Sequence, residues 1–418
     1  MEKKQNRILL CLCHMSGEEM KFVQEAFDTN WVVPLGPNVN GFEADLEAFC
    51  GQNKRVVALS AGTAAVHLGL LACGVGPGDE VLVQSFTFCA SSHPITYLGA
   101  TPVFIDSERE TWNMDPVLLE KAIIDRKEKT GKYPKAIVPV ALYGMPYKID
   151  KIIAIANKYG IPVVEDAAEG FGSKFNGQVL GTFGKYGVLS FNGNKMITTS
   201  GGGALITENK DEWREIMMYA TQYRESYPYY QHEKIGYNYR MSNICAGIGR
   251  GQMTIVNEHI AHHKKVQKLY EELLKDVKGI TVHSQPAPGE YDSNYWLCTM
   301  TIDPEVKVKG QENAYKQVIT GAVGGAAGVI HAASSAVTDC QPNDNIEAMR
   351  MGLDALNIES RPLWKPMHKQ PVYKNAPAYV NGVSEALFKV GMCLPAGPYV
   401  TEDDVHFIVD AIKSLIID

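Results

Sequence analysis

The segment RVVALSAGTAAVHLGLLAC, residues 55–73, holds a candidate strand and a candidate helix in direct succession. Its first part, RVVALS (55–60), is a short apolar run of the kind that forms a fully buried strand. Small residues follow, and the pattern from Thr63 to Cys73 predicts a helix. A buried strand that leads directly into such a helix is typical of a parallel sheet.

The same alternation continues along the chain. Further strands are expected at EVLVQSF (80–86), TPVFID (101–106), KAIVPVALY (135–143) and IPVVEDAAE (161–169), the last of which runs into a turn, with helices over about 115–127 and 149–159. Apolar strands separated by helices indicate a mainly parallel sheet with helices on both faces. The carboxyl ends of such strands meet at one crevice, where ligands bind. The fold class is therefore α/β, and functional residues are expected just after the strands.

The character of the sequence changes after residue 253. A long charged helix is expected over 254–277, a strand at YWLCTMTI (295–302) and a last helix over 403–416. We therefore predict a large domain over 1–253 and a smaller α+β domain over 254–418.

One stretch of the smaller domain, about 309–350, is predicted to be an insertion rich in small residues. Within it, 319–337 is nearly uncharged but consists mostly of Gly, Ala and Ser, whereas a membrane span needs about 20 predominantly apolar residues. We expect no membrane segment here. The N-terminus has too short an apolar run for a secretion signal, which favours a cytoplasmic protein.

The composition excludes some classes of function. The chain has 418 residues, 45% of them apolar and 21% charged, as in ordinary globular proteins. Its net charge of −7 argues against a nucleic-acid binder, which would normally be basic. Nine cysteines are present, but none forms a Cys-x-x-Cys pair, so neither a metal site nor a redox motif is indicated.

Two residues after strands suggest a cofactor. Lys195 closes LSFNGNK (189–195) just before a run of three glycines, and Asp166 ends the strand that begins at Ile161. A buried carboxylate needs a cationic partner, and a protonated pyridine nitrogen would serve. Pyridoxal phosphate needs a lysine for covalent attachment and a carboxylate for its ring nitrogen. A lone lysine is more often an ordinary surface residue, and it is the combination with Asp166 that favours the cofactor.

Two other segments fit the same cofactor. In SAGTAA (60–65), free backbone N–H groups at a helix start would bind a phosphate, with hydroxyls from Thr63 and Ser190. The alternative is a plain helix cap at Thr63. In SFTF (85–88), Phe88 is placed to stack on a planar ring, although such a residue alone is more often part of a core.

Taken together, six motifs resemble the DegT/StrS family of nucleotide-sugar aminotransferases over essentially the whole chain. They are SAGTAA (60–65), SFTFCAS (85–91), EDAAEGFGS (165–173), LSFNGNK (189–195), GYNYRMSN (236–243) and ESRPLWKPMH (359–368). Within the family, GNKMITTSGGG (193–203) and RPLWKPMH (361–368) are most similar to bacterial enzymes that aminate carbon 4 of a UDP-linked 4-keto-6-deoxy-N-acetylhexosamine.

The resemblance implies a fold type I aminotransferase that uses pyridoxal phosphate. It also implies a homodimer in which each active site is shared between subunits. The implied cofactor contacts are covalent attachment at Lys195, the ring nitrogen at Asp166, ring stacking by Phe88, the phosphate at Gly62, Thr63 and Ser190, and Asn238 reaching the phosphate from the partner subunit. Glu169 stands beside the ring oxygen, where many relatives carry Gln or His.

The substrate prediction is an amino transfer from L-glutamate to the UDP-linked keto-sugar, for surface glycan biosynthesis. The candidate substrate contacts are Arg224, Arg240, Arg361, Lys365 and His368. A surface position without a role in binding is the alternative for Arg224, Lys365 and His368. Two other functions stay open at this point. One is amination at carbon 3 of a different UDP-, dTDP- or GDP-linked keto-sugar. The other is a regulatory relative without turnover, against which the presence of both Lys195 and Asp166 argues.

Overall fold

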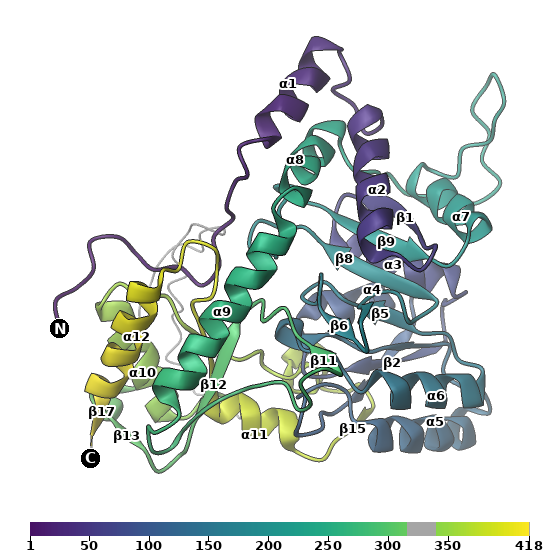
Figure 1. Ribbon diagram of the computed structural model, residues 1–418. Coiled ribbons are helices and arrows are strands. Elements are labelled where there is room, and N and C mark those ends of the chain that lie inside the picture. Colours follow the sequence, from purple (N-terminus) through teal and green to yellow (C-terminus); the bar gives the residue numbers. More distant parts are fainter. Residues whose placement is uncertain (316–339, 418) are drawn as a thin grey trace.

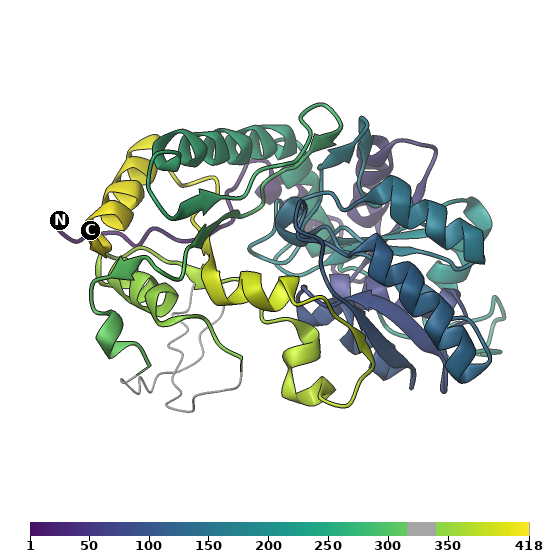
Figure 2. The ribbon, with the colours of Figure 1, turned by 90° about the horizontal axis from the view of Figure 1, so that it is seen from below.

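The structure is a computed structural model that describes residues 1–315 and 340–417. The stretch 319–337, predicted not to cross a membrane, lies outside the described residues. Figures 1 and 2 show two lobes side by side, with the long helix α9 (Val256–Leu274) running along the smaller one. Among the described residues, no helix combines the length and the apolar character that a membrane-spanning segment needs.

The larger lobe is built on one mixed sheet. Its strands are β1 (Arg55–Leu59), β2 (Glu80–Gln84), β3 (Thr101–Ile105), β4 (Ala136–Val138), β5 (Val164–Asp166), β8 (Tyr186–Ser190), β9 (Gly203–Thr207) and β15 (Ala378–Tyr379). The pairings give the order β1-β9-β8-β5 and β15-β3-β2-β4. Parallel bridges Ile137↔Val163 and Val140↔Asp166 join the two halves between β4 and β5. Within this sheet β9 runs antiparallel to both its neighbours, and the other pairings are parallel.

Helices cover both faces of this sheet, as predicted. One face packs against α2 (Pro37–Cys50), α5 (Pro116–Thr130) and α6 (Ile149–Tyr159), and the other against α3 (Gly62–Ala72), α4 (His93–Tyr97) and α7 (Lys210–Ala220). The alternation along a single strand produces this division. In β1, Val56 and Ala58 belong to the first core and Val57 and Leu59 to the second.

The strand predicted at 135–143 is much shorter than expected, since only the three residues of β4 belong to the sheet. The strand predicted from Ile161 begins later, at Val164, and ends at Asp166 as predicted. After β4 the chain leaves the sheet early, because the residues that follow form a loop of the candidate site. The antiparallel direction of β9 was not predicted either, since strand direction is set by pairing partners far away in sequence.

The smaller lobe has its own antiparallel sheet and core. Its sheet has the order β10 (Ile280–Val282), β12 (Cys298–Ile302), β16 (Gly391–Leu394), β14 (Arg361–Pro362). Helices α9, α10 (Asp344–Ala355) and α12 (Glu402–Leu415) pack against it, and α11 (Val383–Val390) follows β15. Ile8 pairs with Ile358 and is buried in this core, so the first residues of the chain pack onto the smaller lobe.

The remaining helices and strands connect the two lobes or lie at their edges. They are α1 (Glu19–Asp28), α8 (Asn243–Met253), β6 (Lys174–Phe175), β7 (Gln178–Val179), β11 (Tyr291–Asp292), β13 (Lys307–Val308) and β17 (Ile416–Ile417). The predicted insertion 309–350 is too wide at its C-terminal end, because α10 begins at Asp344 and buries Ile346 and Met349 in the smaller core.

The run Gly201–Gly203 allows a test of how closely the backbone of β9 approaches the start of α3. A Cβ atom on Gly203 would lie 2.4 Å from the backbone nitrogen of Gly62, whereas a Cβ on Gly201 would meet nothing within 4 Å. Gly203→Ala is therefore expected to displace β9 from the start of α3 and to lower the free energy of unfolding by about 1–3 kcal/mol. Gly201→Ala is the matched control and should leave it unchanged. Urea unfolding measures the free energy of unfolding of both variants. Equal values for Gly203→Ala and Gly201→Ala would contradict the close approach of β9 to α3.

Candidate active site

Lys195 lies in the loop that joins β8 to β9. The backbone N–H of Phe191 donates to the carbonyl of Gly202 at 2.9 Å, and that of Thr199 donates to the carbonyl of Phe191 at 2.9 Å, which closes the loop. The N–H of Lys195 itself donates to the carbonyl of Asn192 at 2.9 Å. Phe191 and Met196 are buried, and their side chains anchor the loop in the interior of the molecule. The lysine side chain is only 13% exposed, so its amine faces the interior of the molecule.

Asp166 ends β5 and is buried among hydrogen-bond donors. One carboxylate oxygen accepts a 2.6 Å hydrogen bond from the hydroxyl of Ser91, which itself lies 2.9 Å from the hydroxyl of Thr87. The other oxygen accepts the N–H of Ala168 at 3.1 Å. Burial raises the pKa of Asp166, while Ser91, Ala168 and the charge of Lys195 act in the opposite direction. Among the described residues Asp166 forms no ion pair, so this carboxylate can still accept a cationic partner.

Glu169, three residues later, is the carboxylate that contacts the lysine. Its Oε1 lies 3.5 Å from Nζ of Lys195, and its Oε2 accepts the backbone N–H of Tyr143 at 2.7 Å. Burial raises the pKa of Glu169, and the charge of Lys195 opposes that shift. Tyr143 reaches this position with a φ of 54°, in the left-handed region that a bulky residue rarely adopts.

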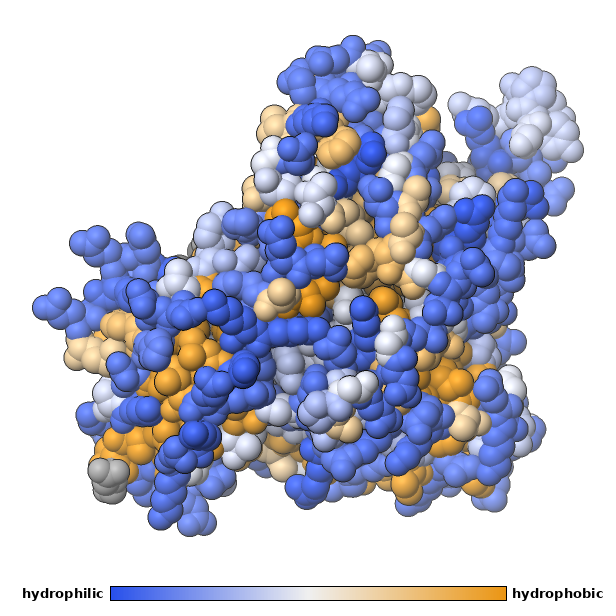
Figure 3. Space-filling model, viewed as in Figure 1, coloured by the Kyte–Doolittle hydropathy of each residue, from blue (hydrophilic) through white to orange (hydrophobic). Residues whose placement is uncertain are grey.

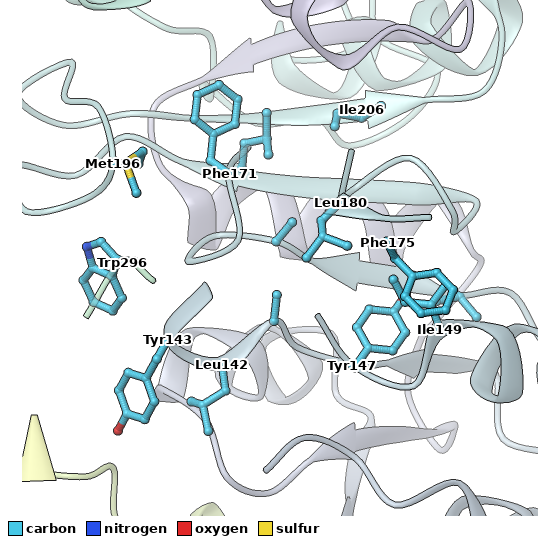
Figure 4. Close-up of a cluster of buried hydrophobic side chains, with 14 of the residues drawn as sticks. Leu142, Tyr143, Tyr147, Ile149, Phe171, Phe175, Leu180, Met196, Ile206 and Trp296 are labelled. Carbon is cyan, nitrogen blue, oxygen red and sulfur yellow. The ribbon is translucent and has the colours of Figure 1, made fainter. Parts of the chain in front are cut away.

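Trp296 faces the same amine. Nζ of Lys195 lies 4.0 Å from the centre of the Trp296 ring, and the indole N–H donates to the carbonyl of Asn194 at 2.6 Å. In the view of Figure 4, Trp296 lies between Met196 and Tyr143 at one end of a buried cluster. The lysine amine thus contacts both an aromatic face and a carboxylate.

The start of α3 has the features of an anion site. The residue before the helix is Ala61, which provides no side-chain cap, and the first turn carries no acidic residue. A Cβ on Gly62 would lie 2.9 Å from Cβ of Ser190, so the end of β8 meets this helix start. The helix begins at Gly62, so Thr63 lies inside the first turn, and a plain cap at Thr63 does not describe this helix start. Free N–H groups together with a neighbouring hydroxyl suit a phosphate.

Phe88 lies beside a pocket. Its ring is 48% exposed and its centre lies 5.2 Å from that of Trp364. The pocket has a volume of about 370 Å³ and is lined by Thr87, Phe88, Cys89, His93, Trp364, Lys365, Met367, Gln370 and Val372. Thr87, which lines this pocket, is connected through the hydroxyl of Ser91 to the carboxylate of Asp166.

The basic side chains that were predicted to bind the substrate lie in different surroundings. Arg240 forms a buried ion pair with Glu43 on α2 and donates to the carbonyl of Ala58 at 3.0 Å, so its guanidinium is engaged within the subunit. Arg361 pairs with Glu359 at 2.8 Å and is 38% exposed, which leaves part of its fork accessible. Lys365 lines the pocket beside Phe88.

Three other predicted residues are also away from the lysine. Arg224 is exposed and lies over the ring of Tyr230, at 4.7 Å from its centre. His368 is held by Ser85 through a 2.7 Å hydrogen bond at the end of β2. Asn238 is exposed on the segment that precedes Arg240, so it is open to a partner subunit.

Three residues of the site were not singled out from the sequence. Ser91 is the last residue of the SFTFCAS motif, and the motif itself was the signal that pointed to it. No local sequence pattern identifies Tyr143 or Trp296 as a site residue. Each is brought to the lysine by a turn or connection whose path depends on contacts with residues far away in the sequence. Among the described residues, no group of three or more His, Cys, Asp or Glu side chains is arranged to hold a metal ion.

These features fit pyridoxal phosphate. The cofactor needs a lysine, a carboxylate for its ring nitrogen, an anion site for its phosphate and an aromatic surface for its ring. Lys195, Asp166, the start of α3 and Phe88 supply one of each. The fit is supported most directly by Asp166, a buried carboxylate that forms no ion pair among the described residues.

Comparisons with known proteins agree with this chemistry. The sequence profile of the DegT/DnrJ/EryC1/StrS aminotransferase family matches residues 14–323 and 311–413. EpsN of Bacillus subtilis (strain 168), classed by name with the pyridoxal phosphate-dependent aminotransferases, is 40% identical over 413 residues, covering 98% of this chain and 96% of EpsN. GDP-perosamine synthase of Caulobacter vibrioides is 33% identical over 412 residues, covering 98% and 99%.

A solved structure gives the same result. The crystal structure of a DegT DnrJ EryC1 StrS aminotransferase from Brucella abortus superposes with a TM-score of 0.80 at 27% identity, covering 95% of each chain. The predicted family, fold type and cofactor are confirmed. The chain belongs to the DegT/DnrJ/EryC1/StrS aminotransferase family and is a pyridoxal phosphate-dependent aminotransferase of nucleotide-linked sugars.

Proposed function

We propose that the enzyme transfers the amino group of L-glutamate to carbon 4 of UDP-2-acetamido-4-keto-2,6-dideoxyhexose, for surface glycan biosynthesis. The observation that carries the amino transfer is the buried pair Asp166 and Lys195 beside the start of α3. The narrower acceptor rests on the motifs at 193–203 and 361–368, which are most similar to enzymes of that specificity. A location in the cytoplasm is part of the same proposal.

Each residue has a distinct task in this proposal. Pyridoxal phosphate supplies the group that carries nitrogen between substrates and the conjugated ring that takes up the electrons of the broken C–H bond. Lys195 would bind it covalently and, once released, would move the proton at the reacting carbon. Asp166 would keep the ring nitrogen protonated, and Phe88 would stack on the ring. Gly62, Thr63 and Ser190 would bind the phosphate, together with Asn238 of the partner subunit.

The pocket beside Phe88 supports a nucleotide-linked sugar as acceptor. Phe88, Trp364, Met367 and Val372 give it an apolar lining that suits a 6-methyl group. Lys365 brings a cation to the same pocket, and Arg361 has an accessible fork for a diphosphate. Arg240 is omitted from this proposal because Glu43 engages it.

The identity of the nucleotide is the open choice in this proposal. One relative named above is a GDP-perosamine synthase, so a GDP-linked acceptor is the second candidate. Amination at carbon 3 of another keto-sugar is the third. Carbon 3 and carbon 4 differ only in how the sugar ring is rotated over the cofactor.

We also propose a homodimer that shares its active sites. Large apolar side chains are exposed in two segments: Phe27, Trp31, Val32, Val33 and Leu35 in the first, and Tyr227, Tyr229, Tyr230 and Ile235 in the second. Figure 3 shows several groups of apolar side chains within a mostly hydrophilic surface, one of them around α8 and α2. Exposed apolar patches of this kind mark association surfaces. The second segment leads directly into Asn238.

The roles of Lys195 and Asp166 can be tested by substitution. Lys195→Ala should lower turnover by at least about 1000-fold, since it removes covalent attachment and proton transfer together. Asp166→Asn should fold but lose on the order of 100-fold, because a neutral amide cannot keep the ring nitrogen protonated. Glu165→Gln is the matched control, since Glu165 is also buried but accepts the N–H groups of Phe183 and Gly184 instead. Near-wild-type turnover in Asp166→Asn would show that this carboxylate has another task.

The shared site can be tested by mixing two inactive variants. Lys195→Ala chains and Asn238→Ala chains should each be inactive as homodimers. A heterodimer should regain activity, because one of its two sites receives an intact lysine from one chain and an intact Asn238 from the other. The measurement is turnover of heterodimers purified with two affinity tags. Heterodimers without activity, or full activity in the Asn238→Ala homodimer, would contradict the shared site.

The acceptor can be identified with a panel of UDP-, dTDP- and GDP-linked keto-sugars. With ¹⁵N-glutamate as donor, we expect turnover to be highest for the UDP-linked 2-acetamido-4-keto-6-deoxy sugar. NMR of the product should place ¹⁵N on carbon 4. Loss of the 6-methyl group should reduce kcat/KM by about 10- to 100-fold, the range for one methyl group in an apolar pocket. An amine on carbon 3, or turnover only with another nucleotide, would reject this acceptor and leave the enzyme class unchanged.

A further inference from the structure

Trp296 makes a contact that the roles assigned so far do not use. It lies between β11 and β12, on the chain that enters the smaller lobe, and is 2% exposed. Its ring faces the Lys195 amine at 4.0 Å from the ring centre. Its N–H donates to the carbonyl of Asn194, the residue before the lysine, at 2.6 Å. The ring is therefore fixed to the backbone of the segment that carries the amine.

A second neighbour of the amine, Glu169, is also fixed. Glu169 lies 3.5 Å from Nζ, and the N–H of Tyr143 holds its other oxygen at 2.7 Å. The side chains of Lys195 and Glu169 are 13% and 4% exposed, so water screens this contact little. Cys11 lies close to both Lys195 and Trp296, and burial raises the pKa of its thiol to about 12, which leaves it neutral.

A packing role alone does not explain this arrangement. Trp296 does belong to the core cluster around Phe171 and Leu180 (Figure 4). A core tryptophan needs an acceptor for its N–H, but it does not need a cation over its face or an acceptor next to that cation. An ammonium group over an indole face is attracted by the negative face of the ring.

We propose that Trp296 is a positioning residue that holds the amine of Lys195 during proton transfer. The proposal rests on the role of Lys195 under "Proposed function". In the step concerned, the C–H bond of the amino donor breaks, the proton joins Nζ of Lys195, and the electron pair passes to the ring of the cofactor. Nζ becomes an ammonium group as the proton arrives. The indole face of Trp296 and the carboxylate of Glu169, both in contact with Nζ, stabilise that charge where it forms.

The first test measures the half-reaction with glutamate in a single turnover. Trp296→Leu should slow it by roughly 3- to 30-fold, the range for losing one desolvated cation–π contact, with binding of glutamate nearly unchanged. Trp296→Phe keeps an aromatic face and should stay within about 3-fold of the wild type. The slowed step should retain or increase its isotope effect with glutamate deuterated at Cα. Trp213→Leu is the matched control, since Trp213 is half-buried and donates its N–H to the carbonyl of Val56 at 3.0 Å.

Three results would overturn the proposal. They are an unchanged rate in Trp296→Leu, equal losses in the Leu and Phe variants, and a slowed reaction whose isotope effect has disappeared. Each would mean that the aromatic face does not act on the proton transfer.

A second test needs no turnover and no correctly folded Leu variant. The protein without cofactor is treated with acetic anhydride, and acetylation of Lys195 is followed by peptide mass spectrometry. Incorporating tryptophans of increasing fluorine content weakens the ring face with little change of shape. Lys195 should then be acetylated progressively faster, by roughly 3-fold or more at the highest substitution. The same series in Trp296→Phe, which keeps the other four of the five tryptophans, should show no trend.

The two tests separate the possible failures. If glutamate gives no half-reaction in the wild type, or if borohydride does not fix the cofactor to Lys195, the proposed function fails. If both controls succeed but acetylation does not depend on fluorine content, only the role of Trp296 is rejected.

Discussion

Two buried carboxylates three residues apart set the main constraint on this molecule. Asp166 and Glu169 are both almost inaccessible to water, and burial raises the pKa of each. Two such groups are costly unless hydrogen bonds and a cation compensate. Ser91 and Ala168 donate to the first, and Tyr143 and Lys195 contact the second. The loops after β2, β4 and β8 must all converge on the end of β5 to provide these partners.

That convergence joins the two lobes at the candidate site. Tyr143, whose N–H holds Glu169, accepts the N–H of Trp364 at 2.8 Å through its hydroxyl. The same hydroxyl contacts Cys393 on β16, a strand of the smaller sheet. Trp296 enters from the chain before β12 and covers the lysine amine. Residues of the smaller lobe therefore contact the groups that hold both the carboxylate of Glu169 and the amine of Lys195.

The cations near the site show why residue type alone does not assign a role. Arg240 and Arg361 look equivalent in sequence, since each lies in a motif that resembles the family. In the structure Arg240 is buried against Glu43, whereas Arg361 keeps part of its guanidinium exposed beside Glu359. The partner of the first comes from a helix nearly 200 positions earlier in the chain. An ion pair between residues so far apart in the chain cannot be identified from the sequence around either residue.

The sequence by itself determined the βα alternation, most helix positions, and the identity of the cofactor-binding family. Apolar periodicity and the order of short motifs are local properties, and they predicted α6 at 149–159 and the end of β5 at Asp166. Only the tertiary structure decided the direction of β9, the early end of β4, and the packing of Ile8 onto the smaller lobe. It also decided that Tyr143 and Trp296 reach Lys195. Each of these depends on contacts between residues far apart in the chain, and the energy of such contacts is not encoded in any single stretch of sequence.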